Sequence, residues 1–208
     1  KYIPANALHT FWPDRRVEVP QPGYLLLEDG RVFEGELVGA TDFSIGEAVF
    51  NTSMTGYQEV LTDPSYAGQI ITMTYPLIGN YGVNATDAES DKVQVAGFVV
   101  REMATMYSNW RATMSLPEYL EQANIPALTG VDTRALTRHL RSAGSMRAAI
   151  APATQSHQDT MERIKAHPLM EGLDLATDVS TDAVYETPAI GTRRFHVVAY
   201  DFGIKRNS

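Results

Sequence analysis

Apolar and polar positions alternate in short runs through the first half of the chain. In YLLLEDGRVFEGELVG, Asp29 and Gly30 lie between two apolar runs, which predicts a β-hairpin because glycine accepts the positive φ of a two-residue turn. After the turn, Phe33 and Leu37 alternate with glutamates, so this strand is expected to have one solvated face. Further strands are predicted at EAVFNTS, GQIITMTY, VQVAGFVVR, MRAAIA and HVVAY.

Three stretches in the second half carry the apolar period of amphipathic helices. SLPEYLEQANI has a capping box, with Ser115 at the N-cap and Glu118 three residues later. DTRALTRHLRSAG begins at a capping aspartate or threonine and ends at Gly144, and SHQDTMERIKAHP begins at Ser156. Strands dominate the first half and helices the second, without strict βαβα alternation, which predicts an α+β fold.

The chain ends on FHVVAYDFGIKRNS. Residues 197–199 are predicted to form a short buried strand, DFG to turn the chain, and KRNS to open a helix. At the other end, residues 1–23 hold four prolines and little periodicity. They are interpreted either as an extended arm docked through Phe11 and Trp12 or as a partly mobile leader.

Composition restricts the class of protein. The chain has 208 residues, 44% apolar and 20% charged, which is typical of a globular protein. Its net charge of −8 argues against binding to nucleic acid or to an anionic membrane, because phosphates require a clustered basic field. No apolar run approaches the roughly 18 residues that span a bilayer, and the first residues lack the apolar core of a signal peptide. A cytoplasmic protein is therefore expected.

The sequence contains no cysteine. These residues therefore cannot supply a disulfide, a zinc–thiolate site or a thiol nucleophile. Walker A, G-x-G-x-x-G, G-x-S-x-G and H-E-x-x-H motifs are also absent, and the five histidines show no metal-ligand spacing. No catalytic residue, metal ligand or cofactor site is therefore assigned within the chain.

Two charged clusters have ordinary explanations. Acidic residues in TDAESD (residues 86–91) are spaced like the start of a calcium loop, but the required glycine and distal glutamate are missing, which favours a solvated turn. A basic stripe on the helix after Asp132 is either a solvated face or a match for an acidic partner. Its members are Arg134, Arg138 and Arg141.

The stretch FNTSMTGYQEVLTDPSYAGQIITMTYPLIGNYG, residues 50–82, mixes small hydroxyl residues, glycines and aromatics. Its DPSY segment suits a type I turn, with Asp63 at the first position and proline setting φ at the second. Such a turn presents the Ser65 hydroxyl at a loop tip. A second bend follows at Gly79. Two alternatives stay open: a loop pair that binds a small polar ligand or a partner, and two ordinary connections.

This stretch, with SNWR at 108–111, DTRALTRHLRSAG and VVAYDFGIKRN, resembles the small subunit of glutamine-hydrolysing carbamoyl phosphate synthetase. The resemblance runs from about Leu25 to Asn207, in the family's order. It implies a heterodimer in which the small subunit hydrolyses glutamine to glutamate and ammonia. The ammonia passes through an internal channel to the large subunit, where ATP, Mg and bicarbonate convert it to carbamoyl phosphate for pyrimidine and arginine synthesis.

The resemblance also implies the domains. They are an N-terminal extension at 1–23, a β-rich α+β domain of the swivelling β/β/α type at 24–192, and the first strand of a truncated class I glutamine amidotransferase domain at 193–208. That second domain carries a Cys-His-Glu triad in the family. Because its thiolate forms a thioester with glutamine, a chain without cysteine is expected to be inactive as a glutaminase by itself.

The resemblance carries a few roles over to single residues. Ser65 matches the serine that binds glutamine. Ser53, Met54 and Asp63 match loop positions of the ammonia path, and Lys205 matches one near the end of the chain. Asp63 either pairs with Lys205 or only forms the turn. Two other functions stay open: a non-catalytic module that docks on the large subunit, and a β domain that binds a small ligand through its loops.

Overall fold

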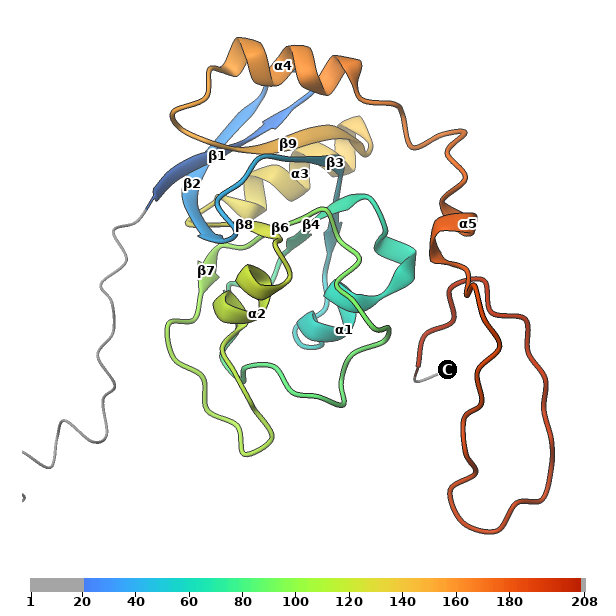
Figure 1. Ribbon diagram of the computed structural model, residues 1–208. Coiled ribbons are helices and arrows are strands. Elements are labelled where there is room, and N and C mark those ends of the chain that lie inside the picture. The colour runs from blue at the N-terminus through green and yellow to red at the C-terminus, as the bar shows by residue number, and fades with distance from the viewer. Residues whose placement is uncertain (1–20, 207–208) are drawn as a thin grey trace, which may run out of the picture.

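The computed structural model describes residues 21–206, in which seven strands close into a mixed β-barrel (Figure 1). Around the barrel they are β1 (Gln21–Leu27), β2 (Val32–Gly39), β8 (Pro126–Thr129), β6 (Gly97–Val99), β4 (Gln69–Met73), β3 (Ser44–Asn51) and β9 (Met146–Pro152). The pairs β8–β6, β6–β4 and β4–β3 are parallel and the others are antiparallel. A second, two-stranded parallel sheet joins β5 (Leu77–Ile78) to β7 (Glu102–Met103).

Short helices pack around this barrel. They are α1 (Tyr57–Thr62), the 3₁₀ helix η2 (Pro64–Tyr66), α2 (Leu116–Gln122), α3 (Thr133–Ala143) and α4 (His157–Ala166). A further helix, α5 (Leu175–Val179), has no buried residue and lies apart from the barrel (Figure 1). In Figure 1, α4 lies along one side of the barrel and α1 and α2 along the opposite side. This arrangement confirms the α+β class expected from the sequence. The predicted caps are also confirmed, since Ser115 and Glu118 form a capping box and Ser156 caps α4.

Several strands have continuous apolar sequences because successive side chains point alternately to the barrel interior and to the helices outside it. Leu25 and Leu27 of β1 point into the barrel, whereas Tyr24 and Leu26 belong to a cluster with Ile164 of α4. The strands on the opposite side divide in the same way between the interior and α1 and α2. Because both faces of these strands are covered, apolar residues occupy most positions on both, and the fully buried Thr72 of β4 is an exception.

The predicted hairpin is confirmed, with a longer turn than expected. Gly30 N donates to Leu27 O and Leu27 N donates to Arg31 O, both at 2.9 Å, so residues 28–30 form the loop. Gly30 has φ +90°, which provides the left-handed step that ends such a turn. The strand β1 also begins at Gln21, inside the predicted N-terminal extension. The proposed docking of Phe11 and Trp12 lies outside the described residues.

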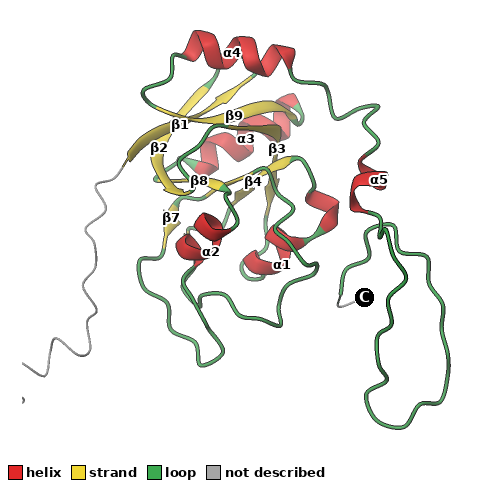
Figure 2. Cartoon of the chain, in the orientation of Figure 1, coloured by secondary structure: helices red, strands yellow, loops and turns green. Residues whose placement is uncertain are grey.

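The prediction of a strand at residues 197–199 is wrong. Residues 180–206 contain no helix or strand and follow α5 as a long loop (Figure 2). Val197 is 82% exposed and Val198 81%, so neither is buried. The physical reason is the closure of the barrel, which leaves no free edge in the seven-stranded sheet for a further strand to join. An apolar run of this kind is stable as a strand only when it pairs with neighbouring strands and other residues cover both of its faces.

Candidate functional site

An open cavity of about 330 Å³ lies beside α1, where the end of the described chain returns to the barrel. Its lining includes Ser53, Glu59, Asp63, Tyr66, Glu89 and Lys205. Three of the five residues singled out from the sequence, Ser53, Asp63 and Lys205, therefore meet in one place. The other two, Met54 and Ser65, do not line it. Met54 is 69% exposed on the loop after Ser53, and Ser65 is exposed on η2.

Asp63 both forms the turn and pairs with Lys205, so it is more than the simple turn former that the sequence left open. Its Oδ1 accepts a hydrogen bond from Ser65 N at 2.9 Å, which caps η2. Its Oδ2 accepts from Lys205 Nζ at 2.7 Å. The residue is 7% exposed. Asp63 thereby joins the DPSY turn to the last residues of the described chain.

The segment before Lys205 and Arg206 is exposed, but these two residues hold its end against the domain. Arg206 pairs with the carboxylate of Asp91, and Arg206 N donates to Glu89 O at 2.9 Å. Within residues 21–206 no set of three acidic or histidine side chains is placed to hold a metal ion. The acidic stretch forms a bend without helix or strand, and its Glu89 lines the cavity.

Glu59 was not found from the sequence. It comes from α1, which has only six residues and no side-chain cap at Gly56. The hydroxyl of Tyr81 serves instead, accepting from Gly56 N at 2.6 Å. Burial raises the pKa of Glu59, and the nearby carboxylates of Asp87 and Glu89 raise it further. The only sequence signal was the apolar spacing within GYQEVLT, which is too short to predict a helix.

Comparison with known proteins assigns the chain to a family. Residues 25–150 match the family model described as carbamoyl-phosphate synthase small chain, CPSase domain. The chain belongs to this family. The resemblance found in the sequence is thus confirmed.

Curated relatives are carbamoyl phosphate synthase small chains. That of a Synechococcus strain is 52% identical over 198 residues, covering 90% of this chain and 51% of the relative. That of Akkermansia muciniphila is 51% identical over 191 residues, covering 88% and 51%. That of Nitratidesulfovibrio vulgaris is 50% identical over 202 residues, covering 88% and 53%. The chain spans about half the length of the curated relatives it matches.

Among solved structures, an aminopeptidase from Aneurinibacillus sp. strain AM-1 matches with a TM-score of 0.39 and 16% identity, covering 65% of this chain and 31% of that one. This similarity is too low to support a statement about fold or function. No helix among residues 21–206 is both long enough and apolar enough to cross a membrane.

The ion pair between Asp63 and Lys205 shifts the pKa values of both groups in opposite directions. Burial acts to raise the pKa of Asp63, but the hydrogen bonds from Lys205 and Ser65 outweigh it, so the pKa lies below its ordinary value. Its hydrogen bond to Asp63 raises the pKa of Lys205. A lowered carboxyl pKa stabilises the folded chain above the unfolded value of about 3.9. That stabilisation is lost as the pH falls through the folded pKa.

Removing the lysine is expected to reverse the shift. In Lys205→Met, burial remains while the main opposing hydrogen bond is lost, so the pKa of Asp63 should rise. An NMR titration of the side-chain carboxyl carbons measures this directly. Asp29 is the internal control, because the hydrogen bonds of Arg31 and His139 hold its pKa down independently of Lys205. An unchanged titration of Asp63 would show that the pair does not form in solution.

Proposed function

We propose that this chain acts as the N-terminal domain of a carbamoyl-phosphate synthase small chain, within an enzyme that hydrolyses glutamine and channels the ammonia to a large subunit. There, ATP, Mg and bicarbonate would complete the synthesis of carbamoyl phosphate. Family membership supports the enzyme. The observation that carries the role of this domain is the cavity in which Ser53, Asp63 and Lys205 meet.

We assign this cavity to the ammonia path. Ammonia must remain unprotonated to act as a nucleophile, so the walls of its path should not donate protons. The hydrogen bond with Asp63 raises the pKa of Lys205, which makes its ammonium group a poorer acid. The lowered pKa of Asp63 keeps its carboxyl group ionised. The pair therefore offers a polar surface that retains its own proton, and Met54 continues the path from the loop beside Ser53.

Ser65 is proposed to contact the glutamine substrate. Ser65 is exposed on η2, and the Asp63 cap fixes the backbone of that turn. A hydroxyl both donates and accepts hydrogen bonds, which suits an amino-acid ligand. The thiolate that forms the thioester would come from residues other than these 208, since none of them is cysteine.

The remaining assignments follow the family. The fold is proposed to be of the swivelling β/β/α type, and the protein to be cytoplasmic. The domain would contribute to the large-subunit interface, whose charged rim would include the exposed arginines of α3. Those arginines are Arg134, Arg138 and Arg141.

Ser65→Ala, in the full-length small chain assembled with its large subunit, tests this function. The KM for glutamine is expected to rise about tenfold, which corresponds to one lost hydrogen bond of about 1.4 kcal/mol. Synthesis from added ammonia should stay at the wild-type rate, because ammonia bypasses the glutamine site. Thr154→Ala, which removes the hydroxyl of an exposed residue on the turn after β9, is the control and should change neither quantity. An unchanged KM in Ser65→Ala would remove the assignment, and large-subunit binding with no response to glutamine would favour a docking module.

A further inference from the structure

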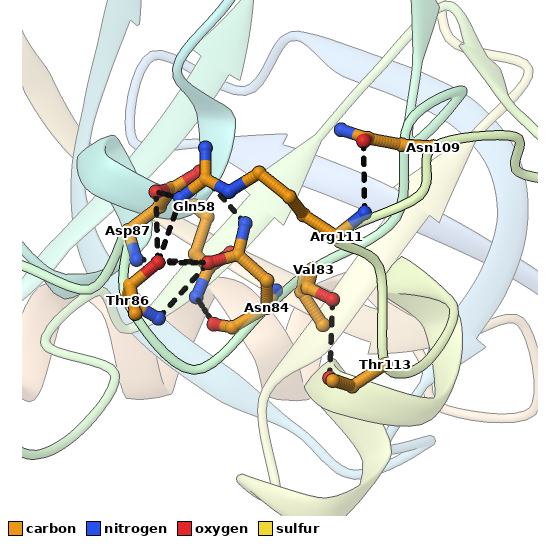
Figure 3. A network of polar contacts seen from close by, with 8 residues as sticks. All are labelled: Gln58, Val83, Asn84, Thr86, Asp87, Asn109, Arg111 and Thr113. Atoms are coloured by element: carbon orange, nitrogen blue, oxygen red, sulfur yellow. Dashed lines mark hydrogen bonds and ion pairs between the residues drawn. The ribbon is translucent and has the colours of Figure 1, made fainter.

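The side-chain amide of Gln58 clamps α1 to the loop at residues 84–91 (Figure 3). Its Nε2 donates to Asn84 O at 2.6 Å, and its Oε1 accepts from Asn84 N at 2.9 Å. Gln58 is 2% exposed and Asn84 9%. Because both bonds are shielded from water, losing either one leaves a buried backbone group unpaired. The clamp therefore fixes the position of α1 relative to the loop.

Arg111 closes the other side of the same loop (Figure 3). Its guanidinium pairs with Asp87 and donates to Thr86 Oγ1 at 2.6 Å. The side chain of Asn84 completes the network, donating to Asp87 Oδ2 at 2.7 Å and accepting from Thr86 N at 2.9 Å. The hydrogen bonds from Asn84 and Arg111 lower the pKa of Asp87. Three segments distant in the sequence thus share one polar network.

The loop also holds the far end of α1. Glu89 N donates to Thr62 Oγ1 at 2.8 Å, and Ser90 Oγ donates to Thr62 O at 2.6 Å. A helix as short as α1 is not stable by itself, so its position depends on these neighbours. The next residue after Thr62 is Asp63. The loop therefore holds the backbone that leads directly into Asp63.

We propose that Gln58 and Arg111 are positioning residues for the cavity: they hold α1 and the 84–91 loop so that Asp63 faces Lys205. Neither side chain is among those that line the cavity. They act through its walls, since α1 carries Glu59 and leads into Asp63, and the loop carries Glu89. The inference rests on the proposed function, in which this cavity passes ammonia.

The test uses full-length small chains assembled with the large subunit. Gln58→Glu keeps the shape and the acceptor for Asn84 N, but places a carboxylate oxygen against Asn84 O. Arg111→Gln removes the pairing with Asp87, and Arg111→Lys keeps the charge without the forked geometry. Arg31→Gln is the matched control, because Arg31 is exposed on the β1–β2 turn, outside the network.

The readout is carbamoyl phosphate formed per glutamate released. We expect Gln58→Glu and Arg111→Gln to lower this ratio about threefold or more, since small displacements along a reaction path are costly. Arg111→Lys should recover part of the loss. Synthesis from added ammonia and the control variant should match wild type. Wild-type ratios in both variants would overturn the proposal, as would a parallel loss of ammonia-driven synthesis, which indicates general instability.

A second measurement separates this inference from the proposed function. If the wild-type complex makes no carbamoyl phosphate from glutamine, the proposed function fails, and hydrogen exchange decides the positioning role. Amides at residues 57–66 and 84–94 should then exchange about tenfold faster or more in both variants, with β1 and β9 unchanged. Unchanged exchange, or exchange raised uniformly over the barrel, would overturn the positioning role.

Discussion

Asp63→Ala is expected to reduce glutamine-driven carbamoyl phosphate synthesis about tenfold to a hundredfold. The substitution removes the acceptor for Ser65 N and the partner of Lys205 at once. The DPSY turn loses its cap, which costs about 0.5–2 kcal/mol of stability. Lys205 is 46% exposed and can turn into solvent, so losing its partner costs little stability but alters the cavity wall. The assay is the rate of carbamoyl phosphate formation from glutamine, in the full-length complex.

Asp63→Asn separates the two tasks of this side chain. The amide oxygen still accepts from Ser65 N, so the turn is preserved, while the charge opposite Lys205 is lost. We expect an intermediate rate. A rate equal to that of Asp63→Ala would place the whole effect in the ion pair, and a wild-type rate would place it in the turn. Asp42→Ala, an exposed carboxylate on the β2–β3 loop, is the control. Wild-type synthesis in both Asp63 variants would contradict a role in the path.

Features that depend on neighbours in sequence were predicted correctly. The capping box joins Ser115 to Glu118, and the turn after β1 lies at Asp29 and Gly30 as predicted, although it spans three residues rather than two. The energies that decide such features come from residues a few positions apart, which the sequence displays directly. The closed barrel was not predicted, because its strand order depends on pairings such as β1 with β9, which lie far apart in the chain.

The same distinction between local and long-range interactions decides which features of the site could be predicted. The DPSY turn and the exposed Ser65 followed from local chemistry. The roles given to Ser53 and Lys205 came only from the family resemblance, since nothing near Lys205 in sequence indicates Asp63. The position of Glu59 depends on α1, which is held by Asn84 and Tyr81 rather than by its own sequence. Long-range polar contacts of this kind leave no periodic pattern to detect.

The erroneous strand at residues 197–199 shows what a buried-strand pattern requires. The apolar run FHVVAY would be stable between two neighbouring strands with both faces covered. Among the described residues this run has no paired strand and no covering layer, and Phe195 is accordingly 83% exposed. A pattern therefore reports what environment a segment needs, and the rest of the chain decides whether that environment exists.

Phe98→Ala and Phe195→Ala form a matched pair that tests this difference. Phe98 is fully buried between the barrel and α1 and α2, so its truncation should lower the free energy of unfolding by about 3–5 kcal/mol. That is a large share of the roughly 5–15 kcal/mol typical of a folded domain. Phe195→Ala removes the same atoms from an exposed loop and should cost less than about 0.5 kcal/mol.

Urea denaturation of the 208-residue chain provides both free energies of unfolding. The comparison with wild type requires that the slope of free energy against urea concentration, the m value, is unchanged. A small effect at Phe98 would mean that the cluster beside α1 is not packed as the structure shows. A cost of about 2 kcal/mol or more at Phe195 would contradict the exposed loop, because truncating a solvated side chain removes no buried surface. Repeating the measurement in a longer small chain then asks a different question. A cost at Phe195 that appears only there would show that the predicted strand forms once neighbouring strands are supplied.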